Sequence, residues 1–100
     1  MVQIRFTILD DLIKELKANN ETTLRVEMIK RVDMGVINHY FIVVSGLVKK
    51  NTILKYETHI GSCVKNEELE FEKSLVEKFE NFKKEIEKEG ITVKAGIYET

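Results

Sequence analysis

The sequence predicts an α+β fold: an antiparallel sheet of about five strands, in the order strand, helix, three strands, helix, strand, with a long amphipathic helix near the C-terminus. Four segments alternate apolar and polar residues with the period of two that half-buried strands show, and a fifth is apolar on both sides of the alternation. Two further segments repeat their apolar residues at spacings of three and four, which is typical of a helix with one buried face.

The first elements are a strand over residues 2–6 and a helix that ends near residue 18. Thr7 is expected to cap this helix, because Asp10 and Asp11 then fall in the first turn, where the positive end of the helix dipole favours acidic side chains. The apolar face of the helix comprises Ile8, Leu9, Leu12, Ile13 and Leu16.

Three strands follow, over residues 22–33, 36–48 and 52–64. Turns are expected at Met34-Gly35 and at Lys49-Lys50-Asn51, because glycine, asparagine and charged residues gather there. The middle strand is apolar on both sides, as expected of a central strand that is covered on both faces.

A second helix is expected from Asn66, as its N-cap, to just before Gly90, and a last strand over residues 91–97. Its apolar stripe comprises Leu69, Leu75, Val76, Phe79, Phe82 and Ile86. No linker, repeat or low-complexity segment divides the chain, so residues 1–100 are expected to form a single domain.

Composition excludes several classes of protein. Charged residues make up 33% of the chain, and no stretch approaches the roughly 20 apolar residues of a membrane span. The first residues alternate in polarity and do not resemble a signal peptide. Cys63 is the only cysteine, so no intrachain disulfide is possible. We therefore expect a cytoplasmic protein with no membrane partner.

Charge is unevenly distributed. Residues 1–65 carry ten basic and seven acidic side chains, whereas residues 66–89 carry five basic and nine acidic ones. The half that forms most of the sheet is thus mildly basic and the long helix is acidic. A run of charges on a helix is typical of a solvated face.

The residues that could support catalysis are Cys63, His39 and His59. Four residues of a strand separate His59 from Cys63 by about 13 Å, too far for a nucleophile and its base unless the chain bends at Gly61. The two histidines could approach each other across adjacent strands, but no third ligand is placed for a metal ion. We expect no catalytic residue, no metal and no cofactor.

A two-residue turn at Met34-Gly35 sets Met28 opposite Phe41 and Val26 opposite Val43 on the core side. The other face of the sheet would then be an apolar strip with basic edges, made of Tyr40, Ile42, Val44, Val48, Arg25, Ile29, Arg31, Ile53, Lys55 and His59. Such a strip is usually covered. The N-terminal helix, a second subunit or a ligand could cover it.

Three functions follow from these observations. The first is a non-catalytic binding and assembly module that forms a homo-oligomer or binds a protein partner, with interface residues Ile42, Val44, Phe79 and Phe82. The second is single-stranded nucleic-acid binding through Arg25, Arg31, Tyr40, Lys49, Lys50 and Lys55. The third is an enzyme that uses Cys63 with a histidine.

Overall fold

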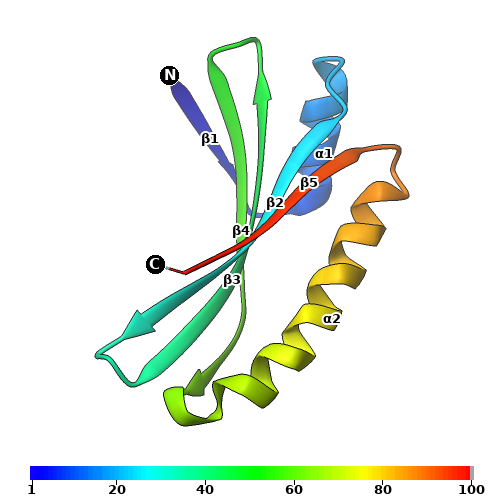
Figure 1. Ribbon diagram of the computed structural model, residues 1–100. Helices are drawn as coiled ribbons and strands as arrows, with labels where there is room; N and C mark the ends of the chain where they lie inside the picture. The colour runs from blue at the N-terminus through cyan, green and yellow to red at the C-terminus, as the bar shows by residue number, and fades with distance from the viewer. Residues whose placement is uncertain (100) are drawn as a thin grey trace.

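The computed structural model describes residues 1–99 and has the expected order of elements (Figure 1). The strands are β1 (Val2–Phe6), β2 (Thr23–Asp33), β3 (Ile37–Val48), β4 (Thr52–Val64) and β5 (Thr92–Glu99). The helices are α1 (Leu9–Ala18) and α2 (Glu68–Glu87), and a 3₁₀ turn, η1 (Lys65–Glu67), precedes α2.

The five strands form one sheet in the order β1-β4-β3-β2-β5. The sheet is mixed, so the expectation of an antiparallel sheet is correct only for β2, β3 and β4. β1 pairs with β4 and β5 pairs with β2, both in parallel. The reason is the helices: a strand-helix-strand connection returns the chain in its original direction, so β1 runs parallel to β2 and β5 runs parallel to β4.

Both helices pack on the same face of the sheet (Figure 1). One apolar cluster contains Leu12 and Leu16 of α1, Phe79 and Ile86 of α2, and the side chains of the sheet beneath them. Leu16 lies directly over Gly46, where an added Cβ would stand 3.0 Å from its Cδ1. The N-terminal helix therefore does not cover the second face, which we call the open face.

The two helices begin later than predicted, and both predicted caps are wrong. Ile8 is the N-cap of α1 and Glu67 that of α2, and neither makes a side-chain capping hydrogen bond. Thr7 lies one residue before the N-cap of α1, and Asn66 lies within the 3₁₀ turn that precedes α2. Acidic side chains in both first turns complement the helix dipoles instead.

The first hairpin contains one residue more than predicted, and the second contains one more than the two-residue turn that the predicted orientation of β4 requires. The nitrogen of Val36 donates to the oxygen of Asp33 at 3.2 Å, which closes the expected turn around Met34 and Gly35, both with positive φ. The ladder, however, starts with Asp33 opposite Ile37, so Val36 is an extra residue. Three residues likewise separate Val48 from its partner Thr52 at the other end of β3.

These extra residues reverse the predicted orientation of the central strand. A one-residue shift in register moves every side chain of a strand to the other face. The assignment of Tyr40, Ile42, Val44 and Val48 to the open face is therefore wrong: all four lie in the core beneath the helices. The predicted residues of β2 and β4 keep their faces, because β3 is shifted equally against both neighbours.

The α2 stripe gives a prediction for stability. Phe79 is 2% exposed within the apolar cluster, so Phe79→Ala should lower the free energy of unfolding by about 3–5 kcal/mol. Its neighbour Glu80 makes a surface ion pair with Lys83 at 3.1 Å, and Glu80→Ala should change the same quantity by less than about 0.5 kcal/mol. Urea denaturation measures both, and equal effects would contradict this packing.

Candidate functional site

The open face carries an apolar strip that follows the central strand. The strip consists of Phe41, Val43 and Leu47 of β3, with Ile29 of β2 and Ile53 of β4 beside them. Val43 is 5% exposed, yet it does not belong to the cluster under the helices. Neighbouring residues on the open face therefore shield the Val43 side chain from solvent.

A row of basic side chains crosses the open face next to this strip. The register sets Arg5 beside Lys55 and Arg25 beside Lys94, with Ser45 of β3 between the two pairs. We call these four cations the basic row. Like charges directly opposite each other destabilise a sheet, and none of the four forms an ion pair with any residue from 1 to 99.

An acidic pair lies two residues further along the same strands. Glu27 of β2 and Glu57 of β4 flank Val43, about 7 Å from the basic row. Within the described part of the chain these two carboxylates form no ion pair either. The open face thus presents a basic row and an acidic pair side by side, both without counter-charges of their own.

An aromatic and imidazole cluster occupies the next positions. The guanidinium carbon of Arg31 lies 4.9 Å from the centre of the Phe41 ring, and His59 meets the same ring edge-on at 5.1 Å. His39 Nδ1 lies 3.4 Å from His59 Nε2. The other ring nitrogen of His39, Nε2, lies 3.8 Å from a carboxylate oxygen of Asp33. Cation-π and edge-to-face contacts therefore already cover much of the Phe41 ring.

A shallow hollow of about 590 Å³ lies at the other end of the strip. Arg25, Lys94 and Lys50 contribute its basic lining, and Leu47 and Ile53 its apolar lining. Glu21 and Glu27 also line this hollow, so apolar surface there meets charges of both signs.

The predicted nucleic-acid-binding residues are divided between the faces. Arg25 and Lys55 belong to the basic row, and Arg31 lies on the same face. Lys49 and Lys50 form the turn between β3 and β4. Tyr40, the expected stacking residue, is 1% exposed and lies under α2, so its ring is not accessible to a base.

The predicted interface residues are inside the molecule. Ile42, Val44 and Phe79 are buried in the core, and Phe82 is partly buried against it. The residues that prediction from the sequence missed are Phe41, Val43, Leu47, Arg5, Lys94, Glu27 and Glu57. Only the strand register could have identified them.

The structure places Cys63 on the opposite face of the sheet from both histidines. The ladder between β3 and β4 is irregular at Tyr40/Phe41, and an extra residue of β4 there exchanges the two faces for the side chains that follow it. His59 therefore pairs with Phe41, whereas Cys63 pairs with Asn38. The sheet itself therefore separates the thiol from the imidazoles. Among residues 1–99 no group of three or more histidine, cysteine, aspartate or glutamate side chains could hold a metal ion.

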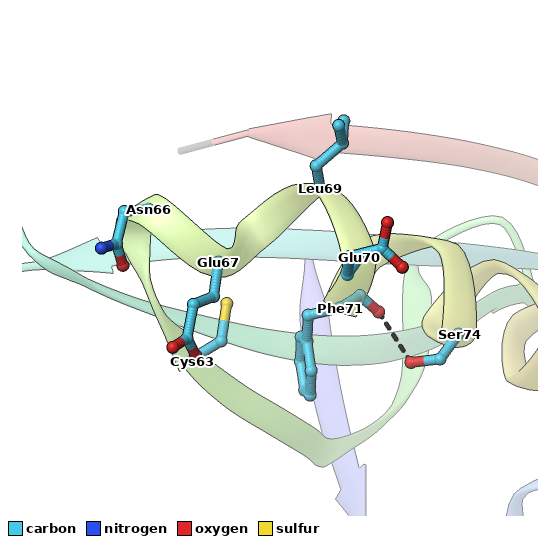
Figure 2. Close-up of a pocket in the computed structure, with 7 residues that line it drawn as sticks. All are labelled: Cys63, Asn66, Glu67, Leu69, Glu70, Phe71 and Ser74. Carbon is cyan, nitrogen blue, oxygen red and sulfur yellow. Dashed lines mark hydrogen bonds between the residues drawn. The ribbon is translucent and has the colours of Figure 1, made fainter.

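A second hollow, of about 560 Å³, lies at the start of α2 (Figure 2). Its lining residues are Cys63, Asn66, Glu67, Leu69, Glu70, Phe71 and Ser74. The Phe71 ring packs so closely on Gly61 that an added Cβ would stand 2.6 Å from it, and Ser74 Oγ donates to the oxygen of Phe71 at 2.7 Å. The Ser74 hydroxyl is thus engaged by the helix backbone, and the Phe71 ring fills the space over Gly61.

A polar cluster holds the first turns of α2 on the sheet. Tyr40 Oη donates to Glu72 Oε2 at 2.6 Å, and Asn38 Nδ2 donates to Glu68 Oε2 at 2.7 Å. Lys30 Nζ lies 3.4 and 3.3 Å from the same two carboxylates. Burial, and then the hydrogen bond to Glu72, raises the pKa of Tyr40 well above its usual value. The hydrogen bond from Asn38, followed by the charge of Lys30, lowers the pKa of Glu68.

Comparison with protein-family models, with curated proteins and with solved structures finds no match to this chain. Across residues 1–99, neither helix combines the length and the apolar character needed to cross a membrane.

The lowered pKa of Glu68 predicts a pH-dependent stability. The stabilisation from its ionised form is present above the unfolded pKa of about 4.3 and is lost as the pH falls through the lower folded pKa. Wild type should therefore exceed Glu68→Gln in urea midpoint at pH 7, and the difference should shrink towards pH 3. Glu77→Gln, on an exposed part of the same helix, is the control. A constant difference at all pH values would contradict the role of Glu68.

Proposed function

We propose that this chain is a non-catalytic binding and assembly module that acts through the open face of its sheet. The observation that carries the proposal is the one-sided packing: both helices cover one face, while the other presents the apolar strip and two sets of charges that have no counter-charge in the described part of the chain. Exposed apolar surface rimmed by polar residues is typical of interaction sites.

The build of the open face supports a binding role. Its apolar residues follow the central strand, and charged side chains stand on the strands at either side. Protein interfaces have the same arrangement of an apolar centre and a polar rim. Because the strip stands on the inner strands of a five-stranded sheet, little ordering is needed when a partner binds.

The placement of the thiol, the imidazoles and the polar cluster in the described part of the chain is compatible with the same proposal. The thiol and the imidazoles lie on opposite faces, and the polar cluster under α2 is engaged in holding the helix to the sheet.

Two leucine substitutions test the proposal. Leu47, on the open face, is 50% exposed, and Leu69, on α2, is 72% exposed, so aspartate at either position leaves the core intact. Leu47→Asp should weaken self-association or partner binding by about tenfold or more, because association would bury the new charge. Leu69→Asp should leave it unchanged. Sedimentation equilibrium measures self-association, and urea denaturation confirms that both variants fold.

The reverse result would contradict the proposal. If Leu69→Asp disrupts association while Leu47→Asp does not, the binding surface lies on α2 rather than on the sheet. If neither substitution matters to any association of the protein, the open face is not a binding surface.

The basic row favours a second candidate function, the binding of single-stranded nucleic acid. Four cations in line could meet phosphates, and Phe41 would replace Tyr40 as the residue on which a base stacks. Binding of this kind weakens steeply as salt concentration rises. A fluorescence titration with labelled oligonucleotides at low salt tests it, with Arg25→Ala and Lys55→Ala as variants. No binding tighter than about 100 µM would exclude this function.

A further inference from the structure

We propose that the partner of the open face is a second copy of this chain, packed sheet against sheet about a twofold axis that crosses the strands between the basic row and the acidic pair. This inference rests on the proposed binding role of the face. It adds the identity of the partner and the register in which it binds.

The charges select this axis. A twofold axis that runs across the strands relates a residue on one side of the axis to the partner's residue at the same distance on the other side. The basic row of one copy therefore lies over the acidic pair of the other. Arg25 then faces the partner copy's Glu27, and Lys55 faces its Glu57. An axis parallel to the strands would instead set the two basic rows against each other, and like charges across an interface are strongly unfavourable.

The apolar strip fits the same axis. Along β3 the positions that face each other are Leu47 and Phe41 on one side of the axis, and Ser45 and Val43 at its centre. On the central strand Val43 thus packs against Ser45 at the axis and Leu47 against Phe41 beside it, while the ion pairs form on β2 and β4 at either side. This matches the apolar core and polar rim of protein interfaces.

The distances suit a packed pair of sheets. Sheets in a sandwich lie about 10 Å apart with their strands offset by about 30°. Opposed arginine and glutamate side chains span such a gap from each side. Because of this angle, the distance between the two sheets is largest at the outer strands. Arg5 and Lys94 therefore lie at the edges of the interface.

The absence of ion pairs within residues 1–99 for these charges is the independent observation. Six charged side chains of the open face, namely Arg5, Arg25, Lys55, Lys94, Glu27 and Glu57, have no opposite charge within 4 Å in the described chain. The glutamates of α2, by contrast, pair repeatedly with neighbouring lysines. A second copy supplies counter-charges for the four inner side chains, Arg25, Lys55, Glu27 and Glu57, while Arg5 and Lys94 stay at the solvated edges of the interface.

Charge reversal tests the register. The first variant is Arg25→Glu with Lys55→Glu, and the second is Glu27→Arg with Glu57→Lys. Each alone sets like charges against each other and should self-associate at least tenfold more weakly than wild type. An equimolar mixture should restore affinity and form the mixed pair, detected by native mass spectrometry with one variant carrying a mass tag.

A variant that keeps the net charge is the control for folding and for nonspecific charge effects. Arg25→Glu with Glu27→Arg in one chain exchanges the two charges and regains complementarity, so it should associate like wild type, whereas either substitution alone should not. Circular dichroism melting checks that each variant is folded.

Several results would overturn the inference. A wild-type protein that stays monomeric at about 100 µM excludes the dimer, and oligonucleotide binding by that monomer would assign the face to nucleic acid instead. A dimer that depends on Leu47 but shows no preference in the mixture excludes this register while the proposed function stands. A dimer insensitive to both sets of variants excludes the inference and the proposed function together.

Discussion

The register of β3 against its two neighbours decides what each face of this protein presents. Because side chains alternate along a strand, the extra residue in each hairpin exchanges the whole set of β3 side chains between the faces. With this register Tyr40, Ile42 and Val44 pack beneath the helices, and Phe41, Val43 and Leu47 are left for the open face. Core packing and the candidate binding surface depend on the same few residues in two turns.

The connections explain why only one face has helices. Both helices link strands that run in the same direction, and the two crossovers place them on the same face of the sheet (Figure 1). Right-handed crossovers are strongly preferred, which restricts the face on which each connecting helix can pack. No further element between residues 1 and 99 is left to cover the other side.

Much of the fold could be predicted from the sequence, because periodicity marks each element. The order of elements and the strand over residues 2–6 are confirmed. The predicted stripe of α2 is confirmed for Leu75, Phe79, Phe82 and Ile86, whereas its assignment to Leu69 and Val76 is wrong, because both are exposed. The parallel edges were missed, because pairing between distant strands leaves no local signal. The predicted composition of the open face is correct for Arg25 and Ile29 of β2 and for Lys55 of β4. It is wrong for β3, whose predicted side chains lie in the core. Asp33-Met34-Gly35-Val36 does not by itself show that Val36 is an extra residue after the turn.

The pattern of charge on the open face bears on the kind of partner it suits. A nucleic-acid backbone is uniformly negative, so a strand laid along the basic row brings phosphates within about 7 Å of Glu27 and Glu57. Arg31 and His59 already cover the Phe41 ring on which a base would stack. A second copy carries both signs in the same spacing, so Arg25 and Lys55 meet its two glutamates while Glu27 and Glu57 meet its basic row. The like-charge pairs that destabilise the isolated sheet then become favourable on association, so the same residues weaken the single chain and strengthen the pair.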